Sequence, residues 1–554
     1  MTDMLSVFGA YDFAVRDALV LSLVALAIHV LLNAGIFAVP QVGLMAVGAY
    51  TSAVLSVDAG TPFPVSVVCG ALAASVAALG LAALLGRLHG IYLAISSIAF
   101  SEIVRVAVLN LPLTGGSQGK VGIPREADDL LICATVVAAV VGLTALRRSR
   151  AGLVIAALRV DPLMARHQGV DVVRYRTGLF ALSGLLAGTA GALHVHMTGF
   201  VEPGQFDFAL LTRLLAVVVI GGMAYVSGSF VGAAVIFGLP FTLSALADYQ
   251  IFVNGALIVL MVAFAPGGIL GLLAGLRTGR DRRTTARTDT AASAWSPSEP
   301  PPAPTPAPAP TGPRAKVIEV NAVSMHFGGL AALDGVALTA CEGEILGLIG
   351  PNGSGKTTLL NVLSGVHVPT SGQGTLLDSN LARLWGKPHR LADVGIARTF
   401  QTIRLMDTSS ALVNVALGVP VAEAHGRMRR AGRLLDEHGL AGVADTLVGE
   451  LPYGVRRRVE IVRALARRPR LLLLDEPTAG MNPEERQQVF DTVAEVRASG
   501  VAVIVVEHDV ATMRAFCDRL LVLDFGRVLA EGAPEEVLNS KEVIRAYIGS
   551  GALA

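Results

Sequence analysis

A glycine-rich segment, residues 350–357, carries the most specific chemical pattern in the chain. It reads Gly-Pro-Asn-Gly-Ser-Gly-Lys-Thr, follows the apolar run 345–349 and precedes the helix-like run 358–363. This is the complete G-x-x-x-x-G-K-[ST] pattern in the strand, loop and helix context that it requires. In such a loop, backbone N–H groups converge on phosphate oxygens, Lys356 reaches the β- and γ-phosphates, and Thr357 can ligate Mg²⁺. The predicted nucleotide contacts are Gly350, Pro351, Asn352, Gly353, Ser354, Gly355, Lys356, Thr357 and Thr358.

Two acids follow a second apolar strand, about 120 residues further along the chain. The run Leu471–Leu474 predicts a buried strand, which puts Asp475 at the carboxyl edge of the sheet, where a metal-binding aspartate acts. Glu476 is then placed to polarise the attacking water. A third apolar strand, 501–506, leads to His508, which we expect to contact the γ-phosphate. Together these residues predict a site that binds and hydrolyses a nucleoside triphosphate.

The composition shows that a large part of the chain must meet lipid. Of 554 residues, 53% are hydrophobic and 16% are charged, whereas soluble domains have about 25% charged residues. A disordered protein, a disulfide-rich secreted module and a single soluble enzyme are therefore excluded. The formal net charge is +1, which argues against an extended nucleic-acid surface.

Apolar stretches follow one another up to about residue 275. A spanning helix needs roughly 20 mostly apolar residues. The candidates lie near 18–39, 63–86, 91–109, 130–146, 178–197, 208–226, 229–247 and 252–274. The shorter stretch 42–57 either spans or re-enters. We therefore predict eight to ten spans.

Charge predicts how these spans are oriented. The segment from Arg147 to Arg176 has seven arginines and two acids, which marks it as cytoplasmic. Arg277 to Arg287 begin a linker that continues with nine prolines between Pro297 and Pro313, and this composition predicts an extended spacer. With both segments inside, four spans lie between them, and the loops 111–124 and 202–208 face outward. The predicted domains are 1–276, the linker 277–315, and 316–554.

Polar residues inside the apolar half are expected to be paired. Glu102 and Arg105 lie three residues apart on one predicted span, where an i,i+3 ion pair would lower the cost of burying charge in lipid. His29, His194 and His196 should face the bundle and form hydrogen bonds. Gly184, Gly188 and Gly191 recur at spacings that let helices approach closely.

Further motifs resemble those of ABC transporters. Gln401 in Arg-Thr-Phe-Gln, the run Leu451, Pro452, Tyr453, Gly454, and His508 occur in the order of ABC ATPases. From residue 317 on, the chain is similar to ATP-binding subunits of branched-chain amino acid importers, and the first half resembles their permeases. The supporting segments are 479–483 and 522–532 in the ATPase part, and 90–95, 100–105, 113–117 and 187–192 in the permease part.

The resemblance implies a multi-domain fold, a polytopic α-helical membrane permease followed by an α/β P-loop ABC ATPase. It also implies that two such ATPase domains enclose two ATP molecules, each site joining one chain's P-loop to the partner's signature loop, here residues 451–454. Gln401 would then sense Mg²⁺, Phe327 would stack on adenine, and Asn482 would belong to the loop that couples the two sites. Thr357, Gln401 and Asp475 are the implied Mg²⁺ ligands.

The signature loop departs from the general Leu-Ser-Gly-Gly-Gln pattern. Pro452 offers neither the hydroxyl nor the N–H that would hold a γ-phosphate, although proline suits the start of a helix. Val455 likewise cannot form a side-chain hydrogen bond. Any loss of hydrolysis should therefore appear in the partner's site rather than at Lys356.

Taken together, the sequence predicts an ATP-driven importer subunit of a bacterial inner membrane, with ATP and Mg²⁺ as cofactors and branched-chain amino acids as cargo. Its partners would be a second permease, a second ATPase, an extracytoplasmic solute-binding protein and membrane lipid, with no nucleic acid. The arginine-rich segment 156–169 resembles the loop that docks such permeases onto the ATPase. Two alternatives stay open: the same machine carrying urea, short amides or aromatic acids, and an ATP-dependent exporter.

Overall fold

The computed structural model describes residues 2–223, 225–242, 250–265, 267–273, 314–420, 423 and 426–548. The chain divides into two compact units. The first consists of Met1–Arg159 with Val172–Ser298, and the second of Val160–Asp171 with Glu299–Ala554. Most of the predicted linker, including its basic start and its prolines, lies outside the described residues.

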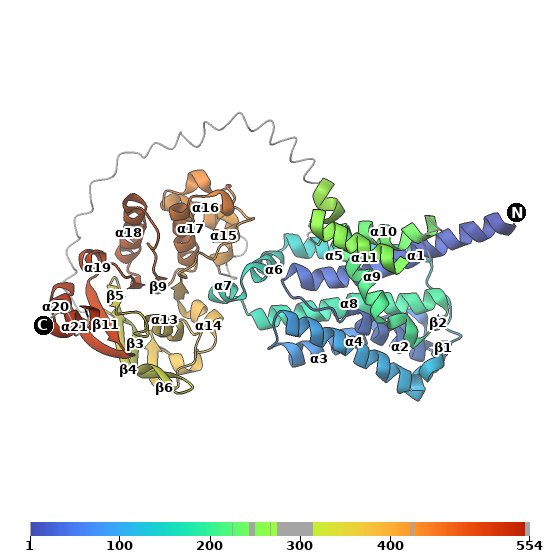
Figure 1. Ribbon diagram of the computed structural model, residues 1–554, viewed down its shortest axis with the longest axis horizontal. Coiled ribbons are helices and arrows are strands. Elements are labelled where there is room, and N and C mark those ends of the chain that lie inside the picture. The colour runs from blue at the N-terminus through green and yellow to red at the C-terminus, as the bar shows by residue number, and fades with distance from the viewer. Residues whose placement is uncertain are drawn as a thin grey trace, which may run out of the picture. The chain divides into compact units, whose positions relative to one another are not determined.

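The first unit is built from apolar helices (Figure 1). They are α1 (Thr2–Asn33), α2 (Gln41–Val57), α3 (Phe63–Leu85), α4 (Ile91–Asn110), α5 (Asp129–Arg148), α6 (Arg150–Val160), α8 (Val172–Thr198), α9 (Phe208–Gly221), α10 (Gly228–Thr242) and α11 (Gln250–Phe264). Among the described residues, five helices are long and apolar enough to cross a membrane, and three shorter apolar helices accompany them. The stretch predicted as short is the 17-residue helix α2.

Small residues let the central helices of this unit touch. A Cβ added at Gly48 of α2 would lie 2.4 Å from the Gly188 Cα atom of α8, and one at Gly191 would lie 2.1 Å from the Met45 carbonyl oxygen. Side chains at these positions would push the helices apart. The predicted close approach at Gly188 and Gly191 is thus confirmed.

The polar pairs expected in this unit are mostly present. Arg105 Nε donates to both carboxylate oxygens of Glu102, at 3.0 and 3.1 Å. His196 is fully buried, and its Nε2 lies 3.1 Å from Ser52 Oγ. His29, by contrast, is buried with its Nε2 atom lacking a hydrogen-bond partner. The short strands β1 (Lys120–Val121) and β2 (Phe200–Val201) pair and join the two loops predicted to face outward.

The second unit contains two sheets. The larger has the strand order β12-β11-β5-β10-β9-β8, and all of its pairs are parallel except β11 with β12. The smaller, antiparallel sheet has the order β4-β3-β6-β7. The strands are β3 (Lys316–Phe327), β4 (Leu330–Cys341), β5 (Ile345–Ile349), β6 (Ser371–Leu376), β7 (Ser379–Asn380), β8 (Ile396–Arg398), β9 (Leu471–Asp475), β10 (Ala502–Val506), β11 (Arg519–Asp524) and β12 (Arg527–Gly532).

Helices cover the parallel sheet and form a separate group beside it (Figure 1). They are α7 (Pro162–His167), α13 (Lys356–Leu363), α14 (Pro388–Val394), α15 (Ala411–Gly418), α16 (Arg427–Glu437), α17 (Tyr453–Leu465), α18 (Pro483–Ala498), α19 (Val510–Phe516), α20 (Pro534–Leu538) and α21 (Lys541–Ile548). The helices α15, α16 and α17 share one hydrophobic cluster. Every residue of β5, β9 and β10 is buried, which explains their continuous apolar runs.

Parallel neighbours also bring the ends of these strands to one edge of the sheet. β10 pairs with β5 on one side and with β9 on the other. The loops that follow the three strands therefore emerge next to one another, and these loops carry the residues singled out by the sequence. The predicted α/β class of this half is confirmed.

Candidate functional site

The glycine-rich loop joins β5 directly to α13. Gly353 and Gly355 have φ angles of +82° and +104°, which residues with a Cβ rarely adopt. A Cβ at Gly355 would also lie 2.6 Å from the Ala332 carbonyl oxygen. The loop can therefore take this path only with glycine at these positions. Lys356, Thr357 and Thr358 begin α13, so backbone N–H groups at the start of the helix face the loop.

Lys356 is held inside this loop. Its Nζ atom donates to the carbonyl oxygens of Gly350 and Pro351, at 2.7 and 2.8 Å. Burial lowers the pKa of Lys356, while Glu476 and Asp475 act in the opposite direction. The ammonium group is thus a buried donor with negative charge nearby, which suits exchange of a carbonyl partner for a phosphate oxygen.

Three of the predicted residues meet at the neighbouring strand ends. Gln401 Nε2 donates to Glu476 Oε2 at 2.9 Å, and His508 Nε2 lies 2.7 Å from Glu476 Oε1. Glu476 itself has φ +46°, an uncommon angle for a residue with a side chain. Its backbone N–H donates to the Val506 carbonyl at 3.0 Å, which fixes it beside β10. The cluster holds one carboxylate between an amide and an imidazole.

Asp475 has a partner that the sequence did not indicate. Arg398 Nη2 donates to its Oδ2 atom at 3.1 Å, and both side chains are buried. Arg398 Nη1 donates to Asn361 Oδ1 and Ser364 Oγ, at 2.7 and 2.8 Å. Arg398 therefore ties the end of β9 to the helix that begins at Lys356.

Arg457 is a second residue that sequence reasoning missed. Its side chain is fully buried on α17, where it donates to the carbonyl oxygens of Phe400 and Gln401 at 2.6 and 2.9 Å. It also reaches the Glu476 carbonyl at 3.2 Å and pairs with Glu460 at 2.8 Å. One guanidinium thus links α17, the Gln401 loop and the strand end that carries Glu476.

The remaining predicted residues lie apart from this cluster. Pro452 and Tyr453 are exposed at the start of α17, whereas Leu451 and Gly454 are buried. Among the described residues, no hydrogen bond joins 451–454 to the loop 350–358. Phe327 is 45% exposed at the end of β3, and its ring meets His367 edge-on. Asn482 caps α18 in a reciprocal capping box with Glu485.

Residues 160–171 pack within the second unit, against the loop after Gln401. Asp161 forms an ion pair with Arg404 and caps α7 through the N–H groups of Leu163 and Met164. The His167 ring lies 5.2 Å from that of Phe400, and Arg467 donates to the Gln168 carbonyl at 2.7 Å. A segment distant in sequence is therefore part of the second unit.

Comparison with known proteins extends these findings. Residues 11–265 match the family model described as the permease component of the branched-chain amino acid transport system, and 333–479 match the ABC transporter model. Residues 527–552 match the branched-chain amino acid ATP-binding cassette transporter model.

Two relatives match the second half along almost their whole length. The high-affinity branched-chain amino acid transport ATP-binding protein BraF of Pseudomonas aeruginosa is 37% identical over 251 residues, which are 42% of this chain and 98% of the relative. The corresponding protein LivG of Salmonella typhimurium is 38% identical with the same coverage. A solved nucleotide-free cassette of an ABC transporter has 29% identity and a TM-score of 0.39, and covers 42% of this chain and 99% of that structure.

The family models and the two relatives confirm the resemblance inferred from the motifs. A permease-type domain and an ATP-binding cassette, which match separate family models, occur here in one polypeptide. The chain therefore belongs to the ABC transporter family, as a membrane permease joined to an ATPase that couples ATP hydrolysis to transport.

Proposed function

We propose that this chain is a subunit of an ATP-driven importer for branched-chain or similar amino acids in a bacterial inner membrane. The observation that carries the proposal is the match of residues 11–265 to a branched-chain amino acid permease component, in the same chain as a cassette similar to BraF and LivG. An exporter is the weaker alternative, because fused exporters tend to have six long spans with extended cytoplasmic helices. Other cargoes, such as urea, short amides or aromatic acids, would use the same architecture.

In this proposal, different residues of the second unit bind the nucleotide and catalyse its hydrolysis. Lys356 and the backbone N–H groups of residues 350–358, other than Pro351, hold the phosphates, and Phe327 stacks on adenine. Glu476 accepts a proton from the attacking water. His508 orients that water and contacts the γ-phosphate. Such proton transfer by a positioned carboxylate is worth about 10²–10⁴-fold in rate.

The residues proposed to hold Mg²⁺ fit that ion. Thr357, Gln401 and Asp475 offer hydroxyl, amide and carboxylate oxygens, the ligand types that Mg²⁺ prefers. Gln401 donates to Glu476 through Nε2, so its amide oxygen is not used in that bond. Bound Mg²⁺ would supply neutralisation of charge on the β- and γ-phosphates.

A second ATPase would complete each site, with residues 451–454 serving the partner's nucleotide. The exposure of Pro452 and Tyr453 at the start of α17 supports this role. The other proposed partners are a second permease, a solute-binding protein outside the membrane, and lipid around the apolar helices.

Pro452→Ser is expected to raise ATP turnover of the assembled complex, because a serine hydroxyl supplies the donor that proline lacks. One added hydrogen bond to a charged group is worth roughly 1.5–3 kcal/mol, and we expect at least about a fivefold gain. Turnover per complex in lipid nanodiscs measures it, with Ser371→Ala, at an exposed position of β6, as a surface control. Unchanged turnover in Pro452→Ser would show that this loop does not limit hydrolysis.

Residues 160–171 are proposed to transmit ATPase movements to the permease. Their support is the set of contacts to the Gln401 loop, in which His167 meets Phe400 and Asp161 pairs with Arg404. A movement of Gln401 on nucleotide binding would then be passed to α7 through its neighbours Phe400 and Arg404.

This contact should weaken in acid. Burial lowers the pKa of His167 to about 3, and nearby Arg398, Arg404 and Arg166 add to the effect. The histidine is neutral when packed, so its contribution is complete above pH 6.5 and is lost as the pH falls toward 3. Between pH 7.5 and 5.5 the packed state should lose about 1.4 kcal/mol, roughly tenfold in protection of the α7 amides from hydrogen exchange.

The measurement is hydrogen exchange at the two pH values, corrected for the intrinsic rates. The matched variant is His167→Phe, which keeps a ring against Phe400 and cannot take up a proton; His167 Nε2 has no hydrogen-bond partner to lose. The pH effect should disappear in this variant. An equal loss of protection in both proteins would assign the effect to another group.

The proposed function is tested by uptake of labelled leucine into cells that carry the complete transporter. Unlabelled valine, urea and benzoate serve as competitors, and a Lys356→Ala chain serves as the inactive control. Uptake that valine alone suppresses, and that Lys356→Ala abolishes, is the expected result. Absence of leucine uptake by an assembled complex would reject this cargo, and outward transport of leucine would reject import.

A further inference from the structure

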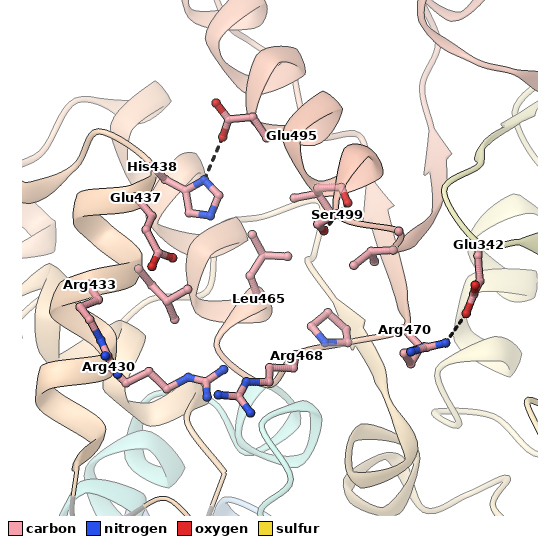
Figure 2. A pocket seen from close by; sticks show the side chains of 15 residues that line it. Glu342, Arg430, Arg433, Glu437, His438, Leu465, Arg468, Arg470, Glu495 and Ser499 are labelled. Carbon is pink, nitrogen blue, oxygen red and sulfur yellow. Dashed lines mark hydrogen bonds and ion pairs between the residues drawn. The ribbon is translucent and has the colours of Figure 1, made fainter. Parts of the chain in front are cut away.

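A cavity of about 860 Å³ lies in the second unit, outside the nucleotide site (Figure 2). Its walls come from α16, the end of α17 with the following turn, the end of α18, and Glu342 after β4. None of the residues proposed to contact ATP lines it. Its volume falls within the roughly 300–1,000 Å³ of small-molecule sites.

Three arginines gather at one end of this cavity. Arg430 and Arg433 stand one turn apart on α16, and Arg468 follows α17. Figure 2 shows the guanidinium groups of Arg430 and Arg468 pointing toward each other. Arg430 is 8% exposed, and its Nε atom has no hydrogen-bond partner within the described part of the chain. Like charges at this spacing repel, so an anion placed between them stabilises the arrangement.

A single carboxylate now serves two of these arginines. Glu423 Oε2 accepts from Arg430, and its Oε1 lies 3.4 Å from Arg468 Nη1. Arg433 has no ion pair among the residues that the structure describes. Two guanidiniums thus share one carboxylate at this end and the third pairs with no described residue, which leaves donors for a second anionic group.

The backbone of Arg468 is also unusual. Its φ angle is +55°, in the left-handed region that residues with a side chain rarely adopt. Such a conformation costs of order 1–3 kcal/mol. Here it lies in the turn after α17 and accompanies a guanidinium that points toward Arg430 (Figure 2).

The apolar and acidic residues in the other walls of the cavity determine which kind of anion can bind. Leu434, Leu465 and Val496 provide an aliphatic surface. Two further polar pairs, His438 with Glu495 at 3.1 Å and Arg470 with Glu342, are already formed among the cavity walls (Figure 2). Glu437 and Glu495 would repel a dianionic phosphate, whereas a single carboxylate on an aliphatic body would meet complementary groups at both ends.

We propose that this cavity binds a small aliphatic monocarboxylate, with its carboxylate between Arg430, Arg433 and Arg468 and its chain on Leu434, Leu465 and Val496. A carboxylate suits two converging guanidiniums because their planar forks match its two oxygens. Glu423 competes for the same donors and lowers the affinity. The inference is independent of the transported cargo.

The test is calorimetric titration of the full chain in detergent, with the nucleotide site filled by Mg²⁺ and ADP. The probes are 4-methylpentanoate, its neutral amide 4-methylpentanamide, and inorganic phosphate. We expect the carboxylate to bind at least about tenfold more tightly than the amide, since bonds to an ionised acceptor are about twice as strong as neutral ones. Phosphate should also bind more weakly than the carboxylate, because Glu437 and Glu495 repel its additional negative charge.

Substitutions of the arginines that line the cavity test whether 4-methylpentanoate binds there. Arg433→Ala with Arg468→Ala should weaken 4-methylpentanoate binding at least about tenfold, and Glu423→Gln should tighten it about threefold or more, because the competing charge is gone. Arg429→Ala is the control, since this exposed arginine of α16 does not line the cavity. Equal binding of acid and amide, tighter binding of phosphate, or no effect of the double variant would each overturn the proposal. Leucine uptake by the double variant is measured as well, so that a failure of this binding proposal can be told apart from a failure of the proposed transport function.

Discussion

Glu476→Gln is expected to lower ATP hydrolysis by the assembled transporter at least about 100-fold, since a positioned general base contributes about 10²–10⁴-fold. ATP affinity should stay within about threefold, because the glycine-rich loop and Lys356 are unchanged. The structural reason is that Glu476 presents one carboxylate to two partners, Gln401 Nε2 at 2.9 Å and His508 Nε2 at 2.7 Å. An amide keeps the shape but cannot accept a proton from water.

The measurement pairs phosphate release with nucleotide binding on the same purified complex. Glu484→Gln is the matched control, because this exposed carboxylate lies in the first turn of α18 and contacts none of the proposed site residues. It should leave both quantities unchanged. Hydrolysis at more than about a tenth of the original rate in Glu476→Gln would remove this carboxylate from the role of general base.

Arg457→Met should destabilise the second unit by about 3–5 kcal/mol, because it leaves the buried Glu460 carboxylate without its main partner. Both side chains are at most 1% exposed, at a separation of 2.8 Å. The carbonyl oxygens of Phe400, Gln401 and Glu476 lose a donor as well. For a unit of this size the loss corresponds to a fall of roughly 10 °C in the thermal midpoint, at about 2–4 °C per kcal/mol.

Thermal unfolding of the full chain, followed in detergent, measures this loss. Arg456→Met on the same helix is the control, since its pair with Asp407 is partly exposed and such pairs are worth about 0–1 kcal/mol. Arg457→Met with Glu460→Met should cost less than the sum of the single changes, because no buried charge is then left alone. A fall of under about 3 °C in Arg457→Met, equivalent to about 1 kcal/mol, would mean that the guanidinium contributes little net stability.

The residues 350–358 and the pair Asp475 and Glu476 could be found from the sequence alone. Each lies directly after a strand whose residues are all apolar, and a nucleotide-binding loop needs its glycines and lysine at fixed spacing in one continuous segment. The two-part architecture was equally visible, because a lipid-facing half and a charged half differ in composition throughout. That Gln401 and His508 both form hydrogen bonds with Glu476 was not predicted, and it follows from the parallel pairing that brings their strand ends together.

Only the tertiary structure showed which arginine side chains are buried and which groups they pair with. Residues 456–458 are three consecutive arginines, yet Arg457 is fully buried on α17 while Arg456 is not, and Arg463 further along the helix is buried too. Hydrophobic periodicity carries no signal for a buried guanidinium, since its place depends on carbonyl groups more than 50 residues away. The same holds for Arg398 beside Asp475, for Glu423 between Arg430 and Arg468, and for His167 against Phe400. Sequence specifies local chemistry and strand order, whereas the pairing of buried charges exists only once distant segments have come together.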